Sequence, residues 1–222
     1  MRINKLTPRE MEMKKVFKNV SFVFLLLQSC VVFAQGEKIK KLIVIDPGHG
    51  GFDSGAVGIN GVLEKDIVLS IAEEIIALNM KSGEPLEIYL TRYSDTLISL
   101  SDRTRLAKIL KADLFLSLHC NHSDNPNARG VEVFVARKNS KYADDATWFA
   151  YQLQEAFREE LGFESRGVKF SDFQVLREIA DYFPAVLFEL GFLSNWDESI
   201  YYNSSVRFLA LAAVLKKHLI EI

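Results

Sequence analysis

The chain has 222 residues, of which 49% are hydrophobic and 25% are charged, a composition that excludes a disordered protein and suits one globular domain. Its formal net charge of −2 and its pI near 6.1 remove the usual electrostatic reason to expect a nucleic-acid partner. We therefore expect no nucleic acid among its partners.

Residues 1–34 have the pattern of a secretory signal peptide. Three lysines precede the apolar run at 20–27, and Val32 and Ala34 place small residues where a signal peptidase reads the chain. We predict cleavage after Ala34, export to the periplasm or cell envelope, and one mature domain over 35–222. Because residues 1–34 carry six of the 27 basic and two of the 29 acidic side chains, this domain has a net charge of −6.

Two alternatives to cleavage remain open for this segment. An uncleaved anchor helix would need roughly 20 apolar residues, and the polar residues at 28–30 interrupt the run. Leu27-Gln28-Ser29-Cys30 also resembles a loose lipoprotein signal, and contact with a membrane is expected only if Cys30 is lipidated. If Cys30 is removed, Cys120 is the only cysteine left, so no internal disulfide is predicted.

From residue 41 onward, short apolar runs alternate with stretches of helical periodicity, which is the pattern of an α/β sheet. The predicted strands are Leu42–Asp46, Glu87–Thr91, Leu114–Leu118, Val131–Val135 and Ala185–Leu190. The predicted helices are Glu64–Met80, Ser101–Leu110 with Ser101 as its cap, Asp144–Leu161 and Val206–Ile220, and Gly162–Phe170 is expected to be a loop. Nearly continuous apolar strands need cover on both faces. We therefore predict a single three-layer α/β domain with a mostly parallel central sheet and helices on both faces.

A glycine-rich turn, Asp46-Pro47-Gly48-His49-Gly50-Gly51, follows the first predicted strand. Its glycines allow a tight fold that leaves the His49 imidazole at the carboxyl end of the sheet, where open α/β sheets carry their sites. Phosphate binding is the alternative, but the turn lacks the Gly-x-Gly-x-x-Gly spacing and no Lys-Ser/Thr pair follows it. A histidine alone remains weak evidence, because single histidines are usually structural.

Glu64 opens the helix predicted behind this turn. The helix dipole stabilises a carboxylate in the first turn, so a capping charge is the alternative to a functional role. The position is more informative than the residue type, since a helix entry beside the first strand holds a carboxylate rigidly near His49.

His119 ends a second central strand at the same edge of the predicted sheet and should point into the site. His122 competes with it but lies in a polar turn. Cys120 should face away from His119, because neighbouring side chains alternate along a strand. His49, Glu64 and His119 then form the ligand set of a catalytic zinc, one ion per chain, with a fourth position left for water.

Glu189 lies inside an apolar strand, where a charged residue is costly unless it is paired or functional. A raised pKa beside a metal-bound water is what a general base and acid needs. Neutralisation by Arg103 or another buried arginine is the alternative.

Taken together, these segments resemble the zinc-dependent N-acetylmuramoyl-L-alanine amidases of the bacterial cell wall, the amidase 3 family. The resemblance runs from about Lys41 to the C-terminus, and its motifs follow one another in order. They are Ile45-Asp46-Pro47-Gly48-His49-Gly50-Gly51, Glu64 with the helix behind it, Leu90-Thr91-Arg92 with Leu100 and Arg103, Ser117-Leu118-His119 with Asn121, Gly130-Val131-Glu132-Val133-Phe134, Val175-Leu176-Arg177, and Pro184-Ala185-Val186-Leu187 with Glu189-Leu190-Gly191-Phe192-Leu193-Ser194-Asn195.

The resemblance implies that His49, Glu64 and His119 bind zinc and that Glu189 is the catalytic carboxylate of an amidase domain over 35–222. It implies peptidoglycan as the substrate, cut at the amide between the lactyl group of N-acetylmuramic acid and the L-alanine of the stem peptide. Zinc would lower the pKa of its water and polarise the lactyl carbonyl. Glu189 would move the proton from the water to the departing amine.

Some relatives carry an inserted helix that occludes the zinc until a protein activator binds, and an activator is an expected partner for such enzymes. Here only residues 137–143 separate the strand at 131–135 from the next helix. We therefore predict a site without that self-inhibiting helix.

Several alternatives remain open on the sequence alone. Arg92, Arg129 and Arg177 either contact stem-peptide carboxylates or are ordinary structural arginines. A zinc hydrolase of the same fold acting on another peptide-like amide would need the same ligands and base. A non-catalytic wall-binding protein would be expected to lack one of the four site residues, all of which are present.

Overall fold

The computed structural model describes residues 7–9, 11–15, 17–19, 40–83 and 86–220, which fall into two compact units, 1–40 and 41–222. In the first unit, residues 8–9, 11–15 and 17–19 are helical. The predicted cleavage site at Ala34 and the candidate lipidation site at Cys30 lie outside the described residues. No helix within the described ranges is long and apolar enough to cross a membrane.

The second unit is built around one mixed sheet. Within the described part of the chain this sheet has six strands, in the order β2-β1-β3-β6-β4-β5. They are β1 (Leu42–Pro47), β2 (Glu87–Leu90), β3 (Leu114–Asn121), β4 (Val131–Ala136), β5 (Ser165–Ser171) and β6 (Ala185–Phe192). β4 runs antiparallel to β6, and the other neighbouring pairs are parallel. The predicted α/β domain with a mostly parallel central sheet is therefore confirmed.

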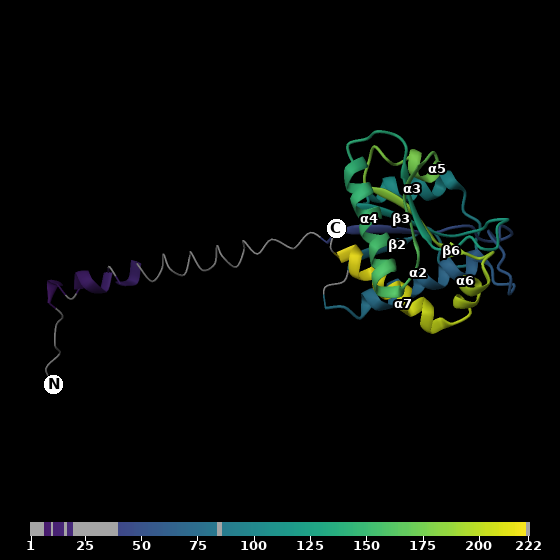
Figure 1. Ribbon diagram of the computed structural model, residues 1–222. Coiled ribbons are helices and arrows are strands. Elements are labelled where there is room, and N and C mark those ends of the chain that lie inside the picture. Colours follow the sequence, from purple (N-terminus) through teal and green to yellow (C-terminus); the bar gives the residue numbers. More distant parts are fainter. Residues whose placement is uncertain (1–6, 10, 16, 20–39, 84–85, 221–222) are drawn as a thin grey trace. The chain divides into compact units, whose positions relative to one another are not determined.

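Helices cover both faces of this sheet and complete the three layers. One face packs against α2 (Glu64–Met80), α4 (Ala143–Leu161) and α7 (Ser205–Ile220), and the other against α3 (Leu100–Leu110) and α5 (Gln174–Arg177). Figure 1 shows α2 and α7 below the sheet and α3 and α5 above it. The short helix α6 (Trp196–Tyr201) follows β6.

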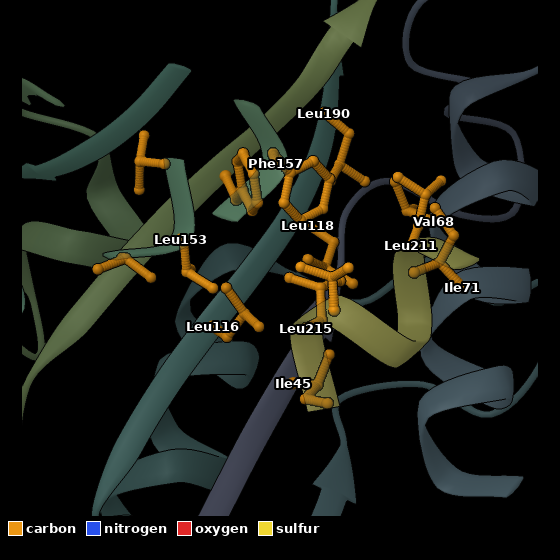
Figure 2. Packing of buried hydrophobic residues seen from close by; sticks show 14 of the residues in the cluster. Ile45, Val68, Ile71, Leu116, Leu118, Leu153, Phe157, Leu190, Leu211 and Leu215 are labelled. Atoms are coloured by element: carbon orange, nitrogen blue, oxygen red, sulfur yellow. The ribbon is translucent and has the colours of Figure 1, made fainter. Parts of the chain in front are cut away.

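Alternate side chains of the central strands fill the core on each face. Leu116 and Leu118 of β3 face the larger cluster, whereas Phe115 faces the smaller one. Figure 2 shows Leu116 and Leu118 packed with Phe157 of α4 and Leu215 of α7. Burial on both faces explains why this strand is apolar at nearly every position from Leu114 to Leu118.

The helices follow the apolar periodicity of the sequence closely. α2 has the predicted bounds and buries Ile67, Ile71 and Ile75 along one stripe. α3 begins one residue earlier than predicted, and its N-cap is Ser99 instead of Ser101, because the Ser99 hydroxyl accepts from the backbone N–H of Asp102.

Most of the segment predicted as a loop, Gly162–Phe170, belongs to β5, so the loop prediction was wrong. β5 lies at the edge of the sheet, and all seven of its residues are exposed or half-buried. It therefore carries little of the apolar signal that marks a covered strand. Gly167, with φ 89°, accompanies a register shift against β4 between Val131 and Val133.

Candidate active site

The carboxyl ends of β1, β3 and β6 meet at one edge of the sheet and border a cleft of about 790 Å³. His49, His119 and Glu189 line this cleft. Leu100 of α3 and Val175 of α5 contribute an apolar part of its wall. Open α/β sheets bind their ligands at such an edge.

Three side chains that can bind a metal converge at this edge. His49 follows β1, Glu64 is the first residue of α2, and His119 lies within β3, which continues past the predicted end to Asn121. Glu64 Oε1 lies 3.1 Å from His49 Nε2 and 2.8 Å from His119 Nδ1. One ligand atom from each of the three residues lies within 4.8 Å of the others, close enough to hold one metal ion. The fold thus brings together the three residues predicted as zinc ligands.

Glu64 is the electrostatic centre of this cluster. Burial raises the pKa of Glu64, but hydrogen bonds and charges from His119 and His49 outweigh it and hold that pKa well below its usual range. Burial lowers the pKa of His49, yet Glu64 and Asp53 together raise it to about 9. Burial likewise opposes charging of His119, and Glu64 overrides it so that the pKa of His119 is also raised. The carboxylate therefore favours positive charge at the place where a divalent cation would fit.

A buried ion pair fixes the turn that carries His49. Arg103 Nη1 lies 2.7 Å from Asp46 Oδ1, and both side chains are almost completely buried. The same guanidinium donates to the carbonyl oxygens of Pro47 and His49, and the Ser117 hydroxyl donates to Asp46. His49 has a φ of 57°, a left-handed conformation that L-residues adopt only when surrounding contacts hold them there.

Gly48 is required by the close approach of the His119 ring. A Cβ atom at this position would lie 2.3 Å from His119 Cε1, well inside van der Waals contact. Arg92 donates to the carbonyl oxygens of Pro47 and Gly48 and so holds the turn from its other side. The turn can then place His49 edge-on against His119, with 4.9 Å between ring centroids.

Glu189 stands beside the cluster, in register with His119 on the neighbouring strand. Its Oε2 atom is shielded from solvent and has no hydrogen-bond partner among the described residues. Burial raises the pKa of Glu189 to about 7, against a lowering by His119 and with a further raising by Glu64. Arg103 does not neutralise it, because that guanidinium is bound to the β1 turn.

The structure also separates the competing candidates. His122 is exposed and lies outside the metal-binding cluster. Cys120 is buried in the larger core, where burial raises the pKa of its thiol, and it faces away from the cleft as predicted. Asp53, whose Oδ2 lies 2.9 Å from His49 Nδ1, was not predicted as part of the site. The available signal was an aspartate four residues after His49, just beyond the glycine-rich turn.

The three arginines considered for substrate contacts have other partners. Arg92 is buried and bound to backbone carbonyls of the active-site turn. Arg129 forms an ion pair of 3.0 Å with Glu164, and Arg177 donates to the Asp172 carbonyl. Residues 137–142, between β4 and α4, form no helix.

A mostly parallel α/β sheet with a His-Glu-His cluster and an unpaired glutamate at its carboxyl edge is the arrangement of a metal-dependent hydrolase. The family model for N-acetylmuramoyl-L-alanine amidase matches residues 43–217. The chain therefore belongs to the amidase 3 family, whose members are generally zinc-dependent.

Individual relatives agree with this assignment. The chain is 38% identical to the N-acetylmuramoyl-L-alanine amidase LytC of Bacillus subtilis, over 71% of this chain and 30% of LytC. It is 39% identical to the endolysin of Bacillus phage SPP1, over 72% of this chain and 58% of the endolysin. It therefore spans less than two thirds of either relative. The catalytic domain of the amidase CwlV from Paenibacillus polymyxa superposes with a TM-score of 0.72 at 35% identity, over 82% of this chain and 97% of that domain.

Proposed function

We propose that this chain is a zinc-dependent N-acetylmuramoyl-L-alanine amidase that hydrolyses peptidoglycan between the lactyl group of N-acetylmuramic acid and L-alanine. The observation that carries the proposal is the convergence of His49, Glu64 and His119 at the cleft that Glu189 also lines, where Glu189 Oε2 has no hydrogen-bond partner among the described residues. Family membership supports the substrate, because the relatives with named activities act on this amide.

The donor set fits one zinc ion. Two imidazole nitrogens and one carboxylate oxygen from three rigid elements are the protein ligands of many catalytic zinc sites, which keep one position open. Asp53 adds the outer support typical of such sites, since it accepts a hydrogen bond from His49 Nδ1 and leaves Nε2 directed at Glu64. We therefore assign His49, Glu64 and His119 as the zinc ligands.

Glu189 is assigned as the general base and acid. When bound, zinc supplies a Lewis acid that polarises the amide carbonyl and lowers the pKa of water. Glu189, with a pKa near 7, accepts a proton from the water that attacks the lactyl carbonyl carbon. It returns this proton to the alanine nitrogen as the carbon–nitrogen bond breaks. The products are a free lactyl carboxylate and a peptide with a new amino-terminal L-alanine.

The proposal extends to the place of action. We propose that residues 1–34 are a signal peptide removed after Ala34 and that the domain acts in the periplasm or cell envelope. Determination of the amino terminus of the exported protein tests this assignment. A mature chain that starts at Gln35 supports it, and a chain that starts at a lipidated Cys30 replaces it with a membrane-attached form.

The decisive experiment measures amino-terminal L-alanine released from purified peptidoglycan by the full chain loaded with zinc. Release that stops with a chelator, returns with zinc and is lost in Glu189→Gln supports the proposal. Glu164→Gln, a change of an exposed glutamate, serves as the matched control. One bound zinc per chain with no release would contradict catalysis on this amide. Cleavage of a different peptide amide would favour the alternative of a zinc hydrolase of the same fold with another substrate.

A partner protein is a second variable in this assay. The CwlD amidase of Clostridioides difficile, 26% identical to this chain with a TM-score of 0.72, was solved in complex with the GerS lipoprotein. We propose that this chain, which has no helix at 137–142, needs no protein activator to displace a self-inhibiting helix from the site. Release that requires added envelope extract would contradict this part of the proposal.

A further inference from the structure

A cationic pair lies two strands from Glu189, on the side of that residue away from the metal-binding cluster. Arg166 and Lys169 of β5 both bind the carboxylate of Glu132 on β4, Arg166 Nε at 2.9 Å. Glu132 is buried and lies opposite Glu189 in the register between β4 and β6. His119, Glu189 and Glu132 thus occupy one row across three neighbouring strands.

Two aromatic rings connect the pair to the wall of the cleft that Glu189 lines. The Lys169 ammonium lies 5.8 Å from the centre of the Phe134 ring, and Phe134 packs edge-on against Phe173, which lines the cleft. Neighbouring strands are roughly 4.8 Å apart, so β5 lies roughly 10 Å from β6. Long side chains on β5 therefore reach the space beside Glu189.

The charges of this group do not cancel. Glu132 accepts from Asn121 through Oε1 and from the two cations through Oε2, so one carboxylate faces two positive charges. The side chains of Arg166 and Lys169 are 36% and 38% exposed. Arg166 Nη2 has no hydrogen-bond partner among the residues that the structure describes. The pair therefore keeps N–H donors and one excess positive charge toward solvent, in a domain whose net charge is −6.

We propose that Arg166 and Lys169 bind a carboxylate of the stem peptide and so select acidic peptides as the leaving group, an inference that rests on the proposed function. An extended peptide covers roughly 3.3 Å per residue. A carboxylate on the second residue beyond the scissile amide then lies within reach of the pair while the amide lies at Glu189. The Glu132 carboxylate positions both cations by forming an ion pair with each of them.

The test uses two zinc-dependent reactions that differ in one group. The full chain is given muramoyl peptides whose second residue carries either a free α-carboxylate or the corresponding carboxamide. We expect Lys169→Met to lower kcat/KM about 10-fold for the carboxylate substrate, the size of a lost hydrogen bond to a charged group, and to leave the carboxamide substrate within about 2-fold. Lys169→Arg should restore most of the preference.

Lys138→Met is the matched control, because Lys138 is also bound to a single carboxylate, that of Asp181, but follows the opposite end of β4. This variant should leave kcat/KM unchanged for both substrates. Equal losses on both substrates in Lys169→Met, or no preference in the wild type, would overturn the inference and leave the pair as neutralisation of Glu132.

Failure of the proposed function would look different, since neither substrate would be cleaved by the wild type with zinc. Equilibrium binding of the free dipeptides, Ala-Glu against its α-amide, still decides the inference in that case. Tighter binding of the carboxylate form that is lost in Lys169→Met supports the subsite. Equal binding of the two forms overturns it.

Discussion

Two glutamates at one sheet edge, Glu64 and Glu189, show how partners set the state of a carboxyl group. Glu64 is only 3% exposed, whereas Glu189 is half-buried and borders the cleft. Burial alone would raise the pKa of both carboxyl groups, since the Glu189 Oε2 atom is also shielded from solvent. The pKa of Glu64 is instead held well below its usual range, and that of Glu189 is raised to about 7.

The difference lies in hydrogen bonding. Glu64 accepts hydrogen bonds from His119 and from the backbone N–H groups of Ala56 and Cys120, and these hydrogen bonds stabilise its charged form. Glu189 Oε2 has no such donor in the described part of the chain. Glu64 thus stays charged at the place where a cation would fit, whereas Glu189 is able to exchange a proton near neutral pH.

Replacement of the unpaired glutamate gives the largest expected effect. Glu189→Gln keeps the shape of the side chain but cannot accept a proton, so we expect kcat to fall by about 10²–10⁴-fold, the usual contribution of a general base. Zinc content should stay at one per chain, because the change leaves His49, Glu64 and His119 in place. Steady-state kinetics together with metal analysis of the purified variant measure both quantities.

Stability distinguishes this role from a structural one. A carboxyl group whose pKa is raised in the folded state destabilises the protein when the pH exceeds its ordinary pKa of 4.5. At pH 8, Glu189→Gln should therefore melt at the same temperature as the wild type or at a higher one. A variant that loses activity and also melts well below the wild type would instead indicate a structural glutamate.

Removal of the buried ion pair that supports the His49 turn gives the next largest expected effect, a loss of stability. Arg103→Met leaves Asp46 buried without its partner, and breaking such a pair costs about 3–5 kcal/mol of unfolding free energy. Arg105→Met is the control two residues away, since its pair with Asp102 is exposed and should contribute no more than about 1 kcal/mol. Urea denaturation of both variants checks the difference. Equal losses would show that the buried pair adds nothing special.

The sequence predicts the His-Glu-His cluster better than it predicts the Arg103–Asp46 ion pair or the cationic pair on β5. These residues stand out because His49 follows, Glu64 opens and His119 lies near the end of an element rich in apolar residues. Arg103 contacts Asp46 across 57 positions, and nothing in the local pattern near either residue predicts that contact. Arg166 and Lys169 lie on an edge strand whose exposed side chains give no alternation, so both the strand and the cationic pair were missed.

Replacement of Asp53 gives a smaller expected effect, which is confined to the affinity for zinc. Asp53→Asn keeps the hydrogen bond from the Gly55 N–H within reach but removes the carboxylate that faces His49 Nδ1. We expect zinc affinity to fall about 10–100-fold, as for other outer-shell partners of metal-binding histidines. Competition with a chromogenic chelator measures this affinity. Unchanged affinity would mean that the turn alone orients His49.

The pH dependence of the metal-free protein gives the smallest effect and tests the comparison of the two glutamates directly. The folded-state pKa of His49 is raised from 6.5 to about 9, so its contribution to stability is complete below pH 6.5 and is lost as pH rises through 9. The stability cost of Glu189 grows between about pH 4.5 and 7 and stays constant at higher pH, so the change in stability from pH 7 to 9 isolates the imidazoles bound to Glu64. With chelator present, the melting temperature should fall by a few degrees across this window. With zinc it should not, because the metal replaces the protons on His49 and His119. A fall of equal size in both conditions would show that groups outside the His-Glu-His cluster cause it.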